Sequence, residues 1–355
     1  MILWYNICAE IRNMILLQLA RVVPHEKGAM ATYARVSKEW QMFFEPYSFR
    51  SLKIHSTDLK RFHEIFAVHR RRAYLQHLGL KTTIPQHRFE RLGTTLGSTD
   101  LENVFAQMML LSKRRAGDDR NMPWIGKQKH RNNAEFDSAL RSLFHRLASW
   151  TVRQAHSPGI KLEIIADSKS HWQEAATVIQ ELCEPMVIHT PDPLVVGSYC
   201  LEKTLRAAEL DFRFLLGVTR GKLPVVQVIS EVSIPNRNIH QFEPNSVAHI
   251  LNSLPRLKTF IWAIRPYARR RNERHFYEQL QETIHMWPTS LTRVGLTQCP
   301  STGLQRMGNP ELIPLVSTLS TRFKDLEIAS TYSGTNELLF WAKAANVSVK
   351  PGSRI

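Results

Sequence analysis

The sequence has few cysteines and no long hydrophobic run, and both absences narrow the class of protein. Its 355 residues include only four cysteines, Cys8, Cys183, Cys200 and Cys299, and no C-x-x-C pair. This excludes a zinc ribbon and a disulfide framework, so we expect reduced thiols in the cytoplasm or nucleus. No run approaches the roughly 18 apolar residues of a membrane span. The apolar start at residues 1–5 is too short for a signal-peptide core, which predicts an intracellular protein with no membrane partner.

Motifs of the common enzyme classes are also missing. The sequence has no G-x-x-x-x-G-K-[ST], no G-x-S-x-G, no G-x-G-x-x-G and no H-E-x-x-H. The histidines are dispersed, and the neighbours His63 and Glu64 lack a second ligand at helical spacing. Glu174 and Glu181 are better explained as solvated charges on a helix. We therefore predict no catalytic residue, no metal site and no cofactor, which describes a protein that is not an enzyme.

Acidic residues are scarce relative to basic ones. The chain has 31 Asp and Glu against 47 Lys and Arg, which gives a net charge of +16. Such a balance favours acidic partners, nucleic acid or anionic membranes, or it serves solubility alone. The basic residues are scattered along the chain and not gathered in one tail. Binding to nucleic acid is therefore kept as a less favoured hypothesis.

The first strong pattern is a predicted helix that begins near residue 7. One apolar stripe recurs every four residues, at Ile7, Ile11, Ile15 and Leu19. Leu16 points well away from this stripe, because successive helical residues turn by about 100°. A surface helix needs one apolar face, so two faces predict that one packs on the protein and the other on a partner. A fully buried helix is the alternative.

A second apolar pattern follows a turn-rich loop at residues 24–28. We expect a helix over residues 29–44, ended by Pro46, with Val36, Trp40 and Phe43 among its apolar residues. The two segments would form a helical module over residues 1–48. A module of this size is marginal alone and is expected to lean on a partner or on the chain that follows.

Together these segments resemble the F-box motif. The first reads Ile7-Cys8-x-Glu10-Ile11-x-x-x-Ile15-Leu16-x-x-Leu19, and the second reads Val36-Ser37-Lys38-x-Trp40-x-x-Phe43. The motif typically reads L-P-x-E-[IL]-x-x-x-[IL]-[LF]-x-x-L, followed after a gap by V-[CS]-[KR]-x-W. Here Ile7-Cys8 replaces the usual Leu-Pro, and loss of the proline predicts a frayed first turn. The remainder is similar to the C-terminal regions of fungal F-box proteins, which resemble leucine-rich repeats.

Short strand patterns recur through residues 49–355. Each places apolar residues at the third and fifth positions after its start, and the starts are Phe49, Leu75, Gly159, Ile229, Leu257, Leu291 and Phe323. The last four are 28, 34 and 32 residues apart, with helical patterns between them. This predicts a mixed α/β fold: a three-helix F-box-like module followed by an irregular solenoid of leucine-rich-repeat type. A compact α/β domain is the alternative.

One segment interrupts the pattern. Residues 113–133, KRRAGDDRNMPWIGKQKHRNN, are polar, basic and aperiodic, so we expect a flexible, exposed insertion. Helical patterns flank it at residues 99–113 and from residue 134 onward, and another at residues 337–345 would close the array.

The F-box resemblance implies a function. It implies a substrate-recognition adaptor of an SCF-type (Skp–cullin–F-box) ubiquitin ligase, which binds a Skp-family linker protein and through it a cullin. The residues that would bind the linker are Ile7, Ile11, Ile15, Leu16, Leu19, Val36, Trp40 and Phe43. The repeats would hold a protein substrate, and the adaptor would act by proximity, without chemistry of its own.

In such an array, the residues between the buried strand positions face the substrate. They are Lys161, Glu163, Glu231, Ser233, Thr259, Ile261, Arg293, Asp325 and Glu327. Their mixed signs argue against a groove dedicated to nucleic acid. Two alternatives to the adaptor remain: an interaction scaffold that no longer recruits the linker, which Ile7-Cys8 favours, and a basic nucleic-acid-binding protein.

Overall fold

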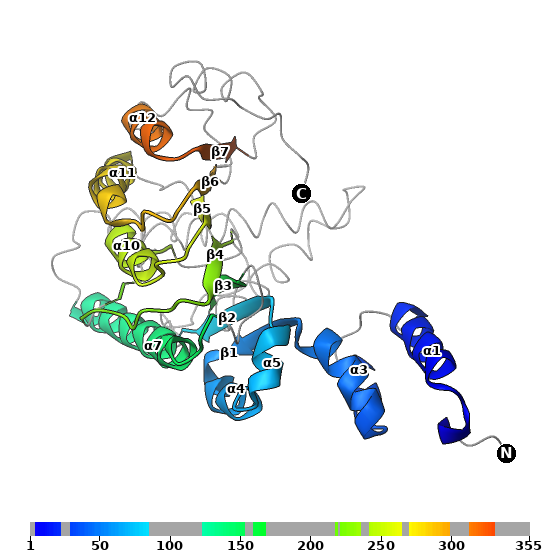
Figure 1. Cartoon of the computed structure of the whole chain (residues 1–355). Helices are drawn as coiled ribbons and strands as arrows, with labels where there is room; N and C mark the ends of the chain where they lie inside the picture. Colours follow the sequence, from blue (N-terminus) through cyan, green and yellow to red (C-terminus); the bar gives the residue numbers. More distant parts are fainter. Residues whose placement is uncertain are drawn as a thin grey trace, which may run out of the picture.

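The structure is a computed structural model that describes residues 4–22, 29–84, 123–152, 159–167, 217–218, 221–235, 241–264, 270–298 and 312–330. Within these residues the chain is mixed α/β, with one seven-stranded sheet and nine α-helices. Figure 1 shows the sheet with helices along one side, and a pair of N-terminal helices that extends away from the first strand.

The sheet is parallel throughout, and each strand pairs with the next strand in the chain. Its strands are β1 (Ser51–His55), β2 (His77–Thr83), β3 (Ile160–Asp167), β4 (Ile229–Ile234), β5 (Thr259–Ile264), β6 (Arg293–Gln298) and β7 (Asp325–Ser330). Each of the seven predicted strand patterns overlaps one of these strands, so the strand predictions are confirmed. The order in the sheet repeats the order in the sequence, as it does when every crossover turns the same way.

The apolar positions of the seven patterns lie opposite one another. One continuous row across the sheet consists of Leu52, Leu78, Leu162, Val232, Phe260, Val294 and Leu326. Successive side chains of a strand point to opposite faces, so this row and the residues two positions later share one face. That face carries the main hydrophobic core.

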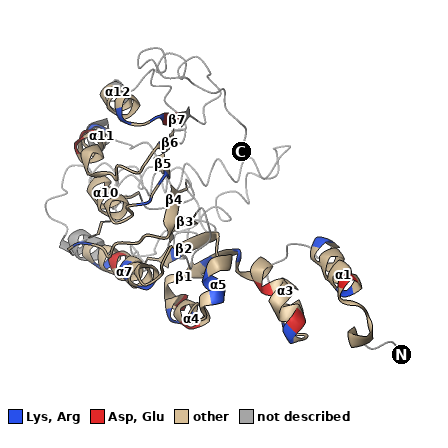
Figure 2. Cartoon of the chain, viewed as in Figure 1, with Lys and Arg blue, Asp and Glu red and all other residues tan. Residues whose placement is uncertain are grey.

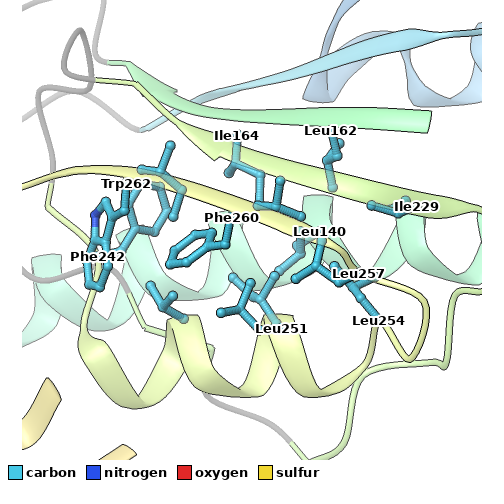
Figure 3. Packing of buried hydrophobic residues seen from close by; sticks show 14 of the residues in the cluster. Leu140, Leu162, Ile164, Ile229, Phe242, Leu251, Leu254, Leu257, Phe260 and Trp262 are labelled. Atoms are coloured by element: carbon cyan, nitrogen blue, oxygen red, sulfur yellow. The ribbon is translucent and has the colours of Figure 1, made fainter. Parts of the chain in front are cut away.

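A row of helices covers the core face: α7 (Pro123–Ala148), α10 (Pro244–Asn252), α11 (Arg270–Thr283) and α12 (Leu312–Arg322). Figure 3 shows how the two layers meet, with Phe260 of β5 directed toward Leu251 of α10. Both side chains are fully buried. The predicted apolar stripes between the strands are therefore the inner faces of these helices.

Part of the predicted insertion is helical. Residues 123–133 form the start of α7, and Asn132 and Asn133 within it are buried. The Asn133 side chain accepts a hydrogen bond from the Gly217 backbone N–H at 3.1 Å, so its buried amide oxygen has a partner and links α7 to residue 217. The prediction of an exposed segment is therefore wrong for Asn132 and Asn133, whereas His130 and Arg131 are exposed as predicted. The predicted residues 113–122 and the helices at 99–113 and 337–345 lie outside the described residues.

Further along α7 the helical prediction is confirmed. Five apolar residues occupy its inner face, and all are fully buried: Phe136, Leu140, Leu143, Phe144 and Leu147. Their spacing of three and four residues gives one stripe on a helix. Burial of this stripe against the first strands fixes the long helix on the sheet.

The N-terminal module has three helices, α1 (Ala9–Val22), α2 (Ala29–Tyr33) and α3 (Lys38–Phe49). The prediction of one helix over residues 29–44 is wrong, because Ser37 interrupts it. The Ser37 hydroxyl accepts a hydrogen bond from the Trp40 backbone N–H at 3.3 Å and caps the start of α3. Pro46 does not end α3. Its missing N–H removes one backbone bond, and the contact of Phe49 with Phe66, 5.7 Å between ring centroids, holds the last turn in place.

Two short helices, α4 (Leu59–Ile65) and α5 (His69–Tyr74), connect β1 to β2. Leu59, Phe62 and Phe66 are buried in the main core, whereas Val68 is exposed at the break between the helices. The module and the sheet therefore meet where α3 contacts β1 and α5.

Candidate partner-binding surface on the N-terminal helices

The three N-terminal helices share a small core of their own. Leu16 of α1, Met30 of α2 and Phe44 of α3 are buried together, apart from the main core. Leu16 is the only residue of α1 that is fully buried. One face of α1 therefore packs on its own module, as the two-faced pattern predicted.

Aromatic rings line the side of α3 that faces this core. The Trp40 ring lies 5.5 Å from Trp4, 5.9 Å from Tyr33 and 5.8 Å from Phe44, measured between centroids. Phe43 contacts Phe44 edge to face at 5.0 Å. Tilted and edge-on pairs of this kind add stability beyond the area they bury. Trp40 and Phe43 are consequently half-buried parts of the module and not free side chains.

Polar contacts also fasten α1 to α3. The Glu39 carboxylate accepts hydrogen bonds from Trp4 Nε1 at 2.8 Å and from Arg12 Nε at 2.9 Å. Arg12 also donates to the Ile7 backbone oxygen at 3.0 Å. These bonds hold the residues before α1 against α3, at the position where the sequence lacks the usual proline.

The opposite face of α1 is apolar and open to solvent. Ile11 is 46 % exposed, Met14 is 60 % exposed and Val22 is 77 % exposed. A shallow groove of about 430 Å³ runs along this face and is lined by Ile11, Met14, Ile15, Gln18, Leu19 and Val22. Five of these six side chains are apolar, which is unusual for a surface that only water covers.

The structure divides the eight residues predicted to bind a linker into three groups. Ile11 and Val36 are exposed, at 46 % and 61 %. The half-buried ones are Ile7, Ile15, Leu19, Trp40 and Phe43. Leu16 lies on the inner face of α1, where it is fully buried in the core of the N-terminal module and is not available to a partner. Sequence reasoning gave Met14 no binding role, although it belongs to the same stripe as Ile11.

A buried carboxylate joins the module to the sheet. The Glu45 side chain of α3 is 4 % exposed and lies 2.6 Å from Arg70 Nη2 and 2.8 Å from Arg71 Nη2, both on α5. Figure 2 shows acidic residues on α3 and basic residues on α5. Burial alone raises the pKa of the Glu45 carboxyl, but the hydrogen bonds from Arg71, Arg70 and Gln41 outweigh it and hold that pKa below its usual value. No local sequence pattern indicates this role, because Arg70 and Arg71 follow Glu45 by 25 and 26 residues.

The residues predicted to face a substrate share the second face of the sheet, opposite the main core. Strand register places Lys161, Glu231, Thr259, Arg293 and Asp325 in one row. A neighbouring row contains Gly79, Glu163, Ser233, Ile261, Gly295 and Glu327. All nine predicted residues therefore lie on one face, while their contact with a substrate stays a prediction.

Charges on the second face pair across neighbouring strands. Lys161 Nζ lies 2.5 Å from Glu231 Oε1, and Arg293 Nη2 lies 2.8 Å from Glu327 Oε2. The hydrogen bond to Glu327 raises the pKa of the Arg293 guanidinium above its usual value. Between these pairs β5 presents the uncharged Thr259 and Ile261. The face thus carries both signs of charge around a neutral centre.

Within the described part of the chain, no three His, Cys, Asp or Glu side chains are grouped so as to hold a metal ion. None of the described helices combines the length and apolar character needed to cross a membrane. No protein-family model matches the chain, and no curated protein matches it significantly.

Proposed function

We propose that this protein is a substrate-recognition adaptor of an SCF-type ubiquitin ligase. The exposed groove on α1 would bind a Skp-family linker, and the second face of the sheet would bind a protein substrate. The observation that carries the proposal is the division of α1 into a buried face at Leu16 and an exposed apolar face at Ile11 and Met14. The resemblance of residues 7–43 to the F-box motif supports the same assignment.

The proposal includes a repeat architecture for residues 49–355. Its support is the sequential parallel sheet, in which one strand pattern recurs seven times and aligns its apolar positions. Each crossover described at β4–β7 contains one helix on the same side of the sheet. Stacking of strand–helix units is how leucine-rich repeats bury a continuous core.

The test is direct binding of a purified Skp-family linker protein to the full chain. We expect Ile11→Asp with Met14→Asp to weaken binding by at least about 100-fold, because two unpaired charges would enter an apolar interface. Both residues are exposed, so α1 should keep its contact through Leu16. Near-wild-type helix content by circular dichroism would verify that the variant is folded.

The control is Val225→Asp, which places one such charge on a residue that is 55 % exposed outside the N-terminal module. It should bind the linker as the wild type does. If the wild type does not bind the linker, the adaptor function is wrong and the scaffold hypothesis takes its place. The opening Ile7-Cys8, where the motif usually has Leu-Pro, is the feature that favours that alternative.

A further inference from the structure

Basic side chains gather where α4, α5 and the end of α7 meet. Arg146 of α7 donates a hydrogen bond from Nη2 to the His63 backbone oxygen of α4 at 2.7 Å. Arg72 of α5 is 6 % exposed, and its guanidinium carbon lies 5.4 Å from the centroid of the Trp150 ring. The Trp150 ring is 6.0 Å from Phe62, the residue before His63. Two guanidinium groups, an imidazole and an indole are therefore close neighbours.

Three nitrogen atoms of this cluster are buried without a hydrogen-bond partner: His63 Nε2, Arg146 Nε and Trp150 Nε1. The indole and guanidinium N–H groups are donors only, so they cannot satisfy each other. A buried donor left without an acceptor costs about 1–3 kcal/mol. The only acceptor among these three atoms is Nε2 of a neutral His63 ring, and a group with several oxygen atoms would serve both the indole and the guanidinium donors.

Among the described residues, this cluster contains no acidic side chain of its own. Residues 138–162 contain no Asp or Glu. Glu45 is engaged by Arg70 and Arg71, and Asp137 is paired with Arg141 at 2.9 Å. Burial, and then the charge of Arg146, lowers the pKa of both Arg72 and His63. The local excess of positive charge favours an anion over water as the missing acceptor.

We propose that His63, Arg146 and Trp150 form a binding site for a small inorganic oxyanion, of the sulfate or phosphate type, with Arg72 supplying further positive charge. His63 and Arg146 are only partly buried, which places the cluster close to the surface, although the three nitrogen atoms themselves are covered. This site is separate from the groove on α1 and does not depend on the proposed ligase function.

Proton uptake accompanies anion binding in this arrangement. His63 is hydrogen-bonded to the Ser142 backbone, and its Nε2 is the buried ring atom without a partner. A neutral ring offers only a lone pair at Nε2, whereas the protonated ring donates there. The charged groups around it are Arg146 from α7, Arg72 from α5, and the exposed Glu64 on its own helix. Sulfate affinity should therefore rise as the pH falls below 6.5, the usual pKa of an imidazole.

The test is an NMR titration of the wild-type chain, labelled with ¹⁵N at tryptophan, with sodium sulfate at constant ionic strength. We expect the indole N–H signal of Trp150, assigned with Trp150→Phe, to move and saturate. Trp287 is the internal control, because its Nε1 is also buried without a partner. A neighbouring guanidinium, that of Arg322, already donates to the backbone oxygens of Ile284 and Trp287. The Trp287 signal should stay in place.

Variants then locate the site. Arg146→Gln should weaken sulfate binding by about 10- to 100-fold, the effect of one charge-assisted hydrogen bond. Arg61→Gln changes an exposed arginine on α4 and should bind as the wild type does. His63→Gln should remove the pH dependence. A Trp150 signal that does not move, or that moves equally with chloride, overturns the proposal without reference to any variant. Equal affinity of the two arginine variants also overturns it.

Discussion

Two adjacent leucines on α1 allow a test of how the N-terminal module is held together. Leu16 is fully buried in the small core with Met30 and Phe44, whereas Leu17 is 42 % exposed. Leu16→Ala and Leu17→Ala make the same chemical change in the same helix. The difference between their effects therefore isolates burial from helix propensity.

The expected magnitude follows from that burial. Truncation of a buried leucine to alanine costs about 2–5 kcal/mol, through lost transfer free energy and the cavity that remains. At about 1.4 kcal/mol per tenfold change, Leu16→Ala should raise the open population of α1 by roughly 30-fold or more. With 14 residues, α1 is too short to be stable alone. Leu17→Ala should cost less than about 1 kcal/mol.

Hydrogen exchange measured by mass spectrometry is the appropriate assay, because it reports on α1 and on the strands separately. Leu16→Ala should lose protection over residues 9–22 and keep it in β3–β5, whose core does not include Leu16. Equal loss of protection in the strands would refute the view that the module has its own core. Equal effects of the two leucine variants would refute the burial assigned to Leu16.

Three further outcomes are expected. Glu45→Gln should lower the free energy of unfolding by about 2–3 kcal/mol in urea titrations at pH 7, because its bonds to Arg70 and Arg71 lose their charge. The folded pKa of Glu45 is depressed, so the difference between the two proteins should vanish as the pH falls below 4.5. The folded pKa of His63 lies below 6.5, so in chloride buffers the urea midpoint should fall as the pH drops below that value, and His63→Gln should flatten the decrease. Gly159→Ala should lower the free energy of unfolding by more than about 1 kcal/mol, measured by the same urea titration, because φ at Gly159 is +126° and an added Cβ would lie 2.7 Å from Ser230 Cβ. Gly221→Ala should lower it by less, because φ there is +55° and an added Cβ would meet no atom within 4 Å.

The strands were predictable because their signal is local and repeated. In the pattern at Leu257, the third and fifth following positions are Phe260 and Trp262, and both proved buried in β5. Every strand has the same spacing, so one register satisfies all seven. The pairing of Lys161 with Glu231 followed from that register, because residues before aligned apolar positions are themselves aligned.

Helix boundaries were less predictable, because they depend on competing short-range effects and on tertiary packing. Ser37 is one of many residues in the sequence that are able to cap a helix. Only its hydrogen bond from the Trp40 backbone N–H, seen in the structure, shows that a helix begins after it. Pro46 is a strong helix breaker in isolation. Here the contact between Phe49 and Phe66 offsets its effect, and that contact joins residues 17 positions apart.

The candidate binding surface was predictable only in part, since helical periodicity identifies the faces of a helix without saying which one is covered. Ile11 and Leu16 were both assigned to the partner, yet one is 46 % exposed and the other is fully buried. The choice is made by Met30 and Phe44, which reach Leu16 from other helices. Glu45 was missed for the same reason, because its partners Arg70 and Arg71 follow it by 25 and 26 residues.

The junction at Glu45 bears on how the proposed adaptor works. A ligase adaptor that acts by proximity gains its effect from a defined distance between the linker and the substrate. Here the separate cores of the module and the sheet are joined by a buried carboxylate with two arginine partners, and by Phe49 against Arg71 at 5.2 Å. A flexible connection would need no such contacts. The buried junction therefore suits a protein in which the groove on α1 and the second face of the sheet keep a fixed separation.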